Sequence, residues 1–569
     1  MTVTASDARS LATHLATLDA DALADLFAAR AVSPTSTWAD FFDVAEGLLE
    51  PAQLARTVAT LTDHEVAVLR DALAADRAVD DPADLAARAL VAPDGTVYAA
   101  VADAVRAAEP VAPASVFTGA PESDAAVAER VFGSAASLAD LLHSAAKAPL
   151  ARIGTGALSA SDRRRLVESG AVATAEDADR LVAIADLAGL LVGVGERSWM
   201  VTNAGLDWLR RRTAERWDLV AHSLRTQLPP ALRSDGGGWR ATEEWAGAHP
   251  FDPAWPDRIA ELAALWVQWG ILGPDGTPSG WARRFAAGGE ADLAALQALL
   301  PHEVDKVYLQ NDLTAIAPGP LEPQLDLRLR TMARRESRAQ AATYRFTAES
   351  IGAALAGGET AASLTDFLTT LSLTGVPQPL AYEIERSATR HGRLRVGPDA
   401  KGHTRISGDP DLLEALAVDQ ALRPLGLLHD GTHLLSRSGV DTTFWMLSDA
   451  RYPVLAVNID GEPRALDRHH VGEDEHSAPT ALTQYRTLVE RLQANSSADT
   501  DAAWLERELD QAVRTRAVVT LDVRMPDGST REVTVEAAGL GGGRLRGRDR
   551  AADVERTLPL SSIISVRPA

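Results

Sequence analysis

The stretch that decides the fold runs from residue 303 to residue 396 and contains four distinctive runs. They are, in order, VYLQNDLTAIA (307–317), PQLDLRLRTMARRES (323–337), TYRFTAESIGAAL (343–355) and VPQPLAYEIERSATRHGRLRV (376–396). The first run alternates apolar and polar residues, which predicts a strand, and the second has the spacing of a helix. A crossing segment and two further helices are expected after it. The stretch therefore predicts a compact unit with one mixed core.

The rest of the chain is long enough for several further domains, because 569 residues exceed what one hydrophobic core supports. We expect a multidomain, mainly α protein with α+β parts. The expected order is an acidic helical bundle (1–130), a winged-helix-like unit (131–215), a second helical or winged-helix-like unit (216–300), the mixed unit (301–396), a small α/β extension (397–462), a linker (463–480), and a helix followed by a small SH3- or Sm-like β-barrel (481–569).

Two local patterns support the helical bundle and the first winged-helix-like unit. Asp19 stands where an N-cap is needed before the apolar periodicity that begins near Ala20. The runs LLVGV and SWMVT flank the turn 195–197 and predict a hairpin between two helices. A looser copy, DRIAELAALWVQWGIL followed by the turn 274–277, predicts a second hairpin in 216–300.

Composition excludes several classes of site and partner. The chain has no cysteine, which removes disulfides and thiolate metal sites, and a reducing cytoplasmic location is expected, with association with the nucleoid left open. The N-terminus has no signal-peptide pattern and no apolar run is long enough for a bilayer, so no membrane partner is expected. The net charge is −23, and 21 acidic residues against 8 basic ones fall within 1–130. Any DNA contact must therefore be a local patch, while the acidic N-terminal region favours protein partners.

The quoted runs resemble a known family. The strand QNDLT, the step TYRFT and the ending ATRHGRLRV follow one another in the order found in the N-terminal accessory domain of bacterial XPB-like helicases. The C-terminal run AAGLGGGRLRGRDRAADVERTLPLSSIISV is similar to a WYL-type module, although Leu521 stands where that family has an aromatic residue. Together with winged-helix-like units, these modules are typical of actinobacterial helicase-associated proteins. The resemblance implies an accessory protein that handles DNA.

Catalytic chemistry is not expected. A helicase motor needs a Gly-rich phosphate loop ending in Lys-Ser/Thr, and this motif is absent, so we expect no enzyme activity and no cofactor. The segment DRHHVGEDEH (467–476) contains metal-ligating residue types, but it is predicted to be linker rather than a preorganised site. No metal site is expected.

Three groups of arginines are the candidates for nucleic-acid binding. Several in the second group share one face if 323–337 is a helix, which would present a ridge to phosphates. The groups are Arg163, Arg164 and Arg165; Arg328, Arg330, Arg334, Arg335 and Arg338; and Arg544, Arg546 and Arg548. The alternative for each is a solvated face in an Arg-rich chain. Six tryptophans between 239 and 281 could stack on bases, but core packing is the better interpretation.

The helix before the predicted hairpin is acidic where base-reading residues would lie, since Glu176, Asp177, Asp179 and Asp186 face one arginine, Arg180. A structural or protein-binding role fits that unit better. The leading hypothesis is a non-catalytic, DNA-associated accessory or regulatory protein. The alternatives are a protein–protein scaffold and a ligand-sensing transcriptional regulator that uses the WYL-like module.

Overall fold

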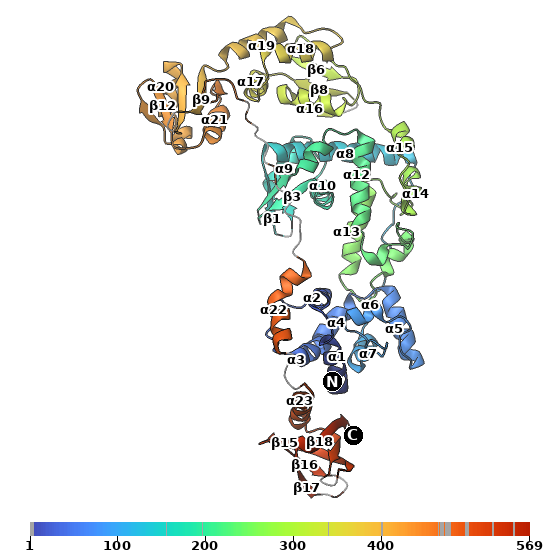
Figure 1. The fold of residues 1–569 in the computed structure, drawn as a ribbon. Coiled ribbons are helices and arrows are strands. Elements are labelled where there is room, and N and C mark those ends of the chain that lie inside the picture. Colours follow the sequence, from blue (N-terminus) through green and yellow to red (C-terminus); the bar gives the residue numbers. More distant parts are fainter. Residues whose placement is uncertain are drawn as a thin grey trace. The chain divides into compact units, whose positions relative to one another are not determined.

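The computed structural model describes residues 5–154, 156–195, 197–338, 341–399, 402–464, 466, 471–472, 480–495, 500–525, 528–549, 552 and 554–568. The chain divides into two compact units, each built from separate segments. Unit 1 contains Met1–Val116, Glu243–Ala260 and Glu475–Ala569, and unit 2 contains Phe117–Thr242 and Glu261–Asp474. The protein is thus multidomain, and each unit combines helices with small sheets (Figure 1).

The N-terminal part of unit 1 is a bundle of short helices. They are α1 (Ala5–Leu15), α2 (Ala20–Ala29), α3 (Phe41–Leu49), α4 (Pro51–Ala59), α5 (Asp63–Ala75), α6 (Ala83–Ala87) and α7 (Ala99–Ala107). The expected cap is confirmed, because the amide of Ala22 donates to Asp19 at 2.8 Å. Thr62 and Glu65 form a reciprocal capping box on α5. These caps satisfy amides that the short helices leave unpaired.

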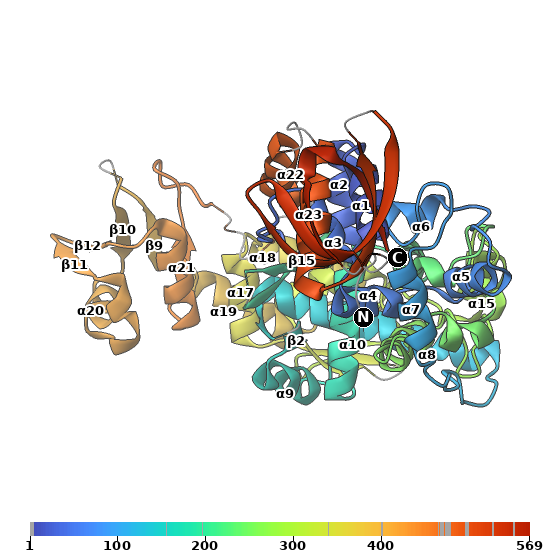
Figure 2. The ribbon, with the colours of Figure 1, turned by 90° about the horizontal axis from the view of Figure 1, so that it is seen from below.

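A helix from the far end of the sequence completes this bundle. In α22 (Ala481–Asn495), Tyr485, Leu488, Val489 and Leu492 are buried in the same core as α1–α7. The hydroxyl of Tyr485 donates to the carbonyl oxygen of Val32 at 2.7 Å. Figures 1 and 2 both show α22 beside α2. The sequence predicted that α22 belongs to the C-terminal module. Its apolar residues lie instead in the core of the N-terminal bundle.

The C-terminal part of unit 1 is a five-stranded antiparallel sheet with one helix on it. Its elements are α23 (Thr500–Thr515), β14 (Val518–Arg524), β15 (Thr530–Gly541), β16 (Arg544–Asp549), β17 (Val554–Pro559) and β18 (Ile563–Pro568), in the strand order β17-β16-β15-β14-β18. Leu505 and Leu509 of α23 pack on Leu521, Val535 and Leu545. The expected barrel is wrong: among the described residues β17 and β18 do not pair, and the sheet stays open with α23 packed on it.

Unit 2 begins with a helical layer and a four-stranded sheet. Its elements are α8 (Asp124–Lys147), β1 (Leu150–Ile153), β2 (Ala157–Leu158), α9 (Ala160–Glu168), α10 (Ala175–Leu187), β3 (Leu191–Val194), β4 (Ser198–Val201), α11 (Asn203–Trp208) and α12 (Thr213–Thr226). The strand order is β2-β1-β4-β3. The predicted hairpin is present as β3 and β4, paired from Leu191 to Val201. The strands β1 and β2 were not expected.

The second expected hairpin is wrong. After α13 (Trp255–Gln268), residues 273–277 form a turn closed by a single bridge between Leu272 and Pro278, and the chain continues into α14 (Arg283–Ala286) and α15 (Leu293–Leu299). The six tryptophans of this region are buried, so core packing is confirmed and no indole is open to stacking; they are Trp239, Trp245, Trp255, Trp266, Trp269 and Trp281.

The stretch from 303 to 396 forms one mixed core of strands and helices, as predicted, but one of its helices is shorter than expected. Its elements are β5 (Tyr308–Leu309), β6 (Thr314–Ala317), α16 (Pro323–Met332), β7 (Arg334–Arg338), β8 (Ala342–Arg345), α17 (Ala348–Ala356), α18 (Ala361–Leu371) and α19 (Gln378–Arg390). The sheet order is β5-β6-β8-β7. The helix expected over 323–337 ends at Met332, because Ala333 turns extended and Arg334–Arg338 pair with β8 as an edge strand.

The last part of unit 2 in the sequence contains a five-stranded sheet. Its elements are β9 (Leu394–Pro398), β10 (Thr404–Gly408), α20 (Pro410–Val418), β11 (Leu428–Asp430), β12 (His433–Ser436), α21 (Val440–Asp449) and β13 (Val454–Ala456), with strand order β11-β12-β10-β9-β13. In the expected linker, residues 467–470 and 473–479 lie outside the described residues, as does most of the segment 467–476. Among the described helices, none has the length and apolar character needed to cross a bilayer.

The docking of α22 onto the N-terminal bundle gives a first prediction. Leu488→Ala should lower the stability of the bundle by about 2–5 kcal/mol, because it leaves a cavity at a position that is 1% exposed. Hydrogen exchange followed by mass spectrometry should show faster exchange in α2 as well as in α22. Glu490→Ala, at an exposed position of the same helix, is the matched control. Protection of α2 that is unchanged by Leu488→Ala would contradict this packing.

Candidate nucleic-acid interface

The expected arginine ridge does not exist as one helix face, because its members belong to two elements. Arg330 lies on α16, whereas Arg334, Arg335 and Arg338 lie on β7. Arg330 places its guanidinium 2.8 Å from a carboxylate oxygen of Asp140 on α8, and Arg335 pairs with the second oxygen of the same residue. Asp140 is 4% exposed. Two of the five arginines of this group, Arg330 and Arg335, are therefore committed to a buried ion pair.

The nearby carboxylates keep Arg330 in its charged form although it is buried. Burial opposes the charged form of Arg330, but the carboxylates of Asp140 and Asp326 outweigh it, so that the pKa of Arg330 is raised. Asp326 also accepts a hydrogen bond of 2.5 Å from the hydroxyl of Tyr344. Burial and this carboxylate raise the pKa of Tyr344. Neither guanidinium of the buried pair is available to a phosphate.

A second set of charges joins α12 to the same segment. Arg212 lies 3.5 Å from Glu303 and 3.2 Å from Glu322. Arg216 stacks on the indole of Trp208, with 5.0 Å from its central carbon to the ring centroid. Burial lowers the pKa of Arg216 to about 10, against the opposing effect of Asp326 and Glu303. The strand-and-helix unit is thus held to α8 and α12 by charged contacts.

The remaining ridge residues leave a smaller basic surface. Arg334 is exposed and has no ion pair among the residues that the structure describes. Lys147, at the end of α8, retains exposed surface, and its pKa is lowered by burial of its amine and by Arg330 and Arg334. The side chain of Arg338 lies outside the described residues. Arg328 pairs with Glu359 at 3.0 Å.

The arginines of α9 differ from one another. Arg163 lies 2.9 Å from Asp179 of α10, and Arg165 lies 2.6 Å from Asp162 on its own helix. Arg164 is exposed. On α10, Arg180 pairs with Asp177 and Glu176. Most of the acidic residues of α10 therefore form ion pairs within the unit. The surface of this unit that remains for phosphates is small.

The arginines of β16 form the clearest open surface. Arg544, Arg546 and Arg548 alternate with the buried residues Leu545 and Gly547, so all three point to the exposed face of the sheet. Arg548 lies across from Glu536 and Glu555, which offset its charge. Arg544 and Arg546 instead face glycines and uncharged residues: Gly541 and Pro559, and Gly539 and Thr557.

Nothing in the described part of the chain covers this pair of arginines. Neither Arg544 nor Arg546 has a carboxylate partner among the described residues. A side chain built at Gly539 or Gly541 would meet no atom within 4 Å. The two guanidinium groups therefore stand on an open, glycine-lined face.

Asp140 is the residue of this region that sequence analysis missed. It interrupts the apolar run Leu138-Ala139-Asp140-Leu141-Leu142 of α8, whose neighbours are almost all buried. A single carboxylate in a helix face that is otherwise apolar requires a cationic partner, since an unpaired buried charge is costly. That pattern was the available signal. As for metals, no group of three or more His, Cys, Asp or Glu residues suited to a metal ion occurs among the described residues.

Comparison with known proteins places the helicase-like segment. Residues 307–429 match the family described as helicase conserved C-terminal domain. The chain is also similar to the DNA 3'-5' helicase XPB of Mycobacterium tuberculosis, with 31% identity over 135 residues. That match covers 23% of this chain and 25% of the relative. A helicase-related domain is therefore present, and the chain spans about a quarter of the length of the curated relative it matches.

The buried carboxylate provides a prediction about stability. Asp140→Asn should destabilise unit 2 by about 3–5 kcal/mol, because it removes the carboxylate that Arg330 and Arg335 share and leaves only Asp326, 3.6 Å from Arg330, to offset two buried guanidinium groups. The loss should appear as faster hydrogen exchange in α16 and β7 and as a lower melting temperature. Asp207→Asn removes an exposed carboxylate paired with Arg210 and should change stability by less than about 1 kcal/mol. Equal effects of both substitutions would contradict the structural role of Asp140.

Proposed function

We propose that the protein is a non-catalytic, DNA-associated accessory or regulatory protein, which acts on DNA or on a DNA-bound machine through its helicase-related domain. The observation that carries this proposal is the match of residues 307–429 to a helicase domain. The named strands of that segment pair antiparallel with one another, and β9 pairs in parallel only with β13, which lies outside the match. The match supports the connection with DNA. The strand arrangement supports the absence of a motor.

The argument against a motor rests on what ATP binding needs. Nucleotide-binding motors place a phosphate loop between a strand and a helix of a parallel sheet, with a lysine that follows a glycine. This chain contains three lysines, Lys147, Lys306 and Lys401, and none of them follows a glycine. A helicase-like domain without this loop can position DNA or a partner, but it cannot use ATP to move.

The other modules fit an accessory role. We assign α8, β1, α9, α10, β3 and β4 to a winged-helix-like unit, since the helices are followed by a hairpin whose strand β4 pairs with β1. Its helix α10 exposes Glu176 and Asp186, which favours a structural or protein-binding role over base reading. The sheet β14–β18 is assigned as the WYL-like module. Its arginines make it the stronger candidate for a phosphate contact.

The first functional prediction concerns ATP. The purified protein should release no phosphate from ATP above background, with or without single-stranded or duplex DNA, because no lysine is placed to bind the phosphates. A coupled phosphate-release assay measures this directly. DNA-stimulated hydrolysis that a point mutation in this chain abolishes would overturn the non-catalytic assignment.

The second functional prediction concerns the open face of β16. Arg544→Gln together with Arg546→Gln should weaken DNA binding at low salt, because two phosphate contacts are lost. The slope of log affinity against log salt should become shallower by about 1.8 for duplex DNA and about 1.4 for single strands. Fluorescence anisotropy with labelled DNA of random sequence, titrated at several salt concentrations, gives both quantities.

The matched control is Arg210→Gln with Arg514→Gln. It removes the same charge from two exposed arginines that already have carboxylate partners, at 2.7 and 2.6 Å. This control should leave the slope within about 0.5 of the native value, since paired arginines release few counterions. An unchanged slope in the Arg544 and Arg546 variant would show that the row is a solvated strand face.

A further inference from the structure

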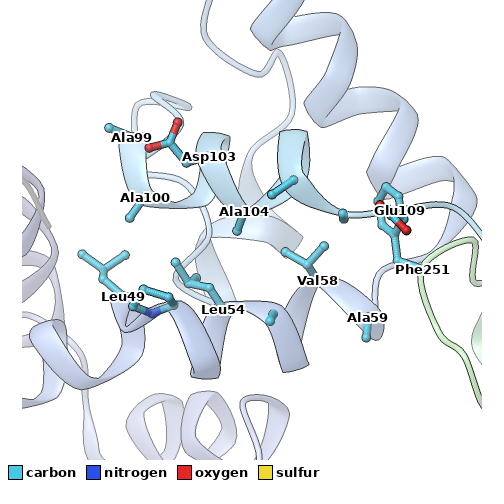
Figure 3. Close-up of a pocket in the computed structure, with 14 residues that line it drawn as sticks. Leu49, Leu54, Val58, Ala59, Ala99, Ala100, Asp103, Ala104, Glu109 and Phe251 are labelled. Atoms are coloured by element: carbon cyan, nitrogen blue, oxygen red, sulfur yellow. The ribbon is translucent and has the colours of Figure 1, made fainter. Parts of the chain in front are cut away.

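The N-terminal bundle has an apolar groove that no part of the described chain fills. It lies between α4 and α7, with a volume of about 360 Å³. Figure 3 shows Leu49, Leu54 and Val58 facing the alanines of α7, with Phe251 at one end. The four larger side chains are buried and form the floor, whereas Ala55, Ala99 and Ala107 are exposed along the walls.

The groove is preformed. Phe251 is held by the guanidinium of Arg70, whose central carbon lies 5.1 Å from the ring centroid. The segment that carries Phe251 is tied to the bundle by two backbone hydrogen bonds, from Val111 to Pro250 at 2.7 Å and from Asp63 to Ala248 at 3.0 Å. Little ordering is therefore left to occur when a ligand binds, which favours affinity.

The shape of the groove favours a helix with large side chains. Alanine walls allow the backbone of a ligand to approach closely, and the deep apolar floor accepts side chains such as Leu, Ile or Phe. The two helices that form the groove have nine residues each, so that they present about 13 Å of parallel wall. That length accommodates the i, i+3, i+4 and i+7 positions of one partner helix.

The charged residues that line the groove favour a partner helix with a positive net charge. Two carboxylates, Asp103 and Glu109, line it, and no cationic residue does. Glu109 is exposed and has no ion pair among the described residues, while Asp103 has Arg106 at 3.3 Å. The acidic excess of the N-terminal region adds to the same field. A second copy of this acidic face would be repelled, whereas lysine and arginine would be attracted.

We infer that the groove between α4 and α7 docks a basic amphipathic helix of a partner protein, with apolar residues on the floor and Lys or Arg beside Asp103 and Glu109. This docking surface is independent of DNA binding. It gives the accessory protein a way to be recruited to a machine by a protein contact.

A selection experiment on the full chain tests this. The probe is a phage-displayed library of helical peptides about 16 residues long, with apolar residues fixed at i, i+3, i+4 and i+7 and Lys, Glu or Gln at the remaining positions. Native protein and the Ala104→Trp variant, in which an indole fills the groove, serve as parallel baits. Peptides enriched on the native protein should carry more Lys than Glu.

The best peptide is then measured by fluorescence anisotropy. Ala104→Trp should weaken its binding about tenfold or more, and Asp103→Asn with Glu109→Gln should weaken it about threefold or more. The second variant alters exposed polar groups, so that it tests the proposal even if the tryptophan variant fails to fold. The controls are Ala74→Trp, on an exposed face of α5, and Asp25→Asn with Asp84→Asn, which remove the same charge outside the groove.

Three results would overturn the inference. The first is enrichment that is equal on native and Ala104→Trp baits, and the second is enrichment of acidic peptides. The third is binding of the apolar dye 1-anilinonaphthalene-8-sulfonate that Ala104→Trp abolishes while no peptide is enriched, because the groove would then take a small apolar ligand instead of a helix.

Discussion

The ion pair of one buried carboxylate with two arginines determines how unit 2 is assembled. Asp140 lies inside α8, and Arg330 and Arg335 reach it from α16 and β7, two elements that meet at Ala333. Breaking such a pair costs more than forming it contributes, since each partner left alone is a buried charge. In the packed arrangement of α16 and β7 on α8, both guanidinium groups reach this one carboxylate. The charges of Arg212 and Arg216 strengthen the same junction, and they also explain why an arginine-rich segment in an acidic protein is largely unavailable to DNA.

The core of the N-terminal bundle is built from segments that lie far apart in the sequence. The N-terminal bundle closes only when α22, nearly 400 residues after α7, places Tyr485 and Leu488 in its interior, and Phe251 comes from a third segment. Such long-range closure delays completion of the bundle until late in the chain, because Phe27 of α2 lacks its contact with Tyr485 until α22 is made. The groove also needs a distant segment, because Phe251, which lines it, comes about 140 residues after α7.

Local chemistry could be predicted from the sequence, and non-local pairing could not. Asp19 was identified as a cap because an N-cap depends on a few neighbouring residues, and the hairpin β3–β4 was found because its alternation and its turn lie within twelve residues. The helix expected over 323–337 was five residues too long, since Arg334–Arg338 have acceptable helix propensity and only pairing with β8 makes them a strand. The five C-terminal strands were found, but the open form of their sheet was not predictable, because it depends on which edge strands pair across the module. Of the candidate site, the exposed row Arg544 and Arg546 follows from alternation alone, whereas the burial of Arg330 and Arg335 requires knowledge of Asp140, nearly 200 residues away.

The distribution of charge suggests a division of labour between the two kinds of surface. With a net charge of −23, the protein as a whole is repelled by DNA, so affinity for phosphate must come from arginines that have no carboxylate partner. Arg544 and Arg546 satisfy this condition, and two such contacts would supply a weak, salt-sensitive attraction rather than tight binding. Weak contact with DNA is useful to a protein that arrives by another route, because two weak contacts on one molecule combine through effective concentration. In our proposal, the groove between α4 and α7 provides that other route, through contact with a partner protein. An accessory protein built in this way would reside on DNA only where its protein partner already is, and the acidic surface that prevents general binding to DNA would then be the source of its selectivity.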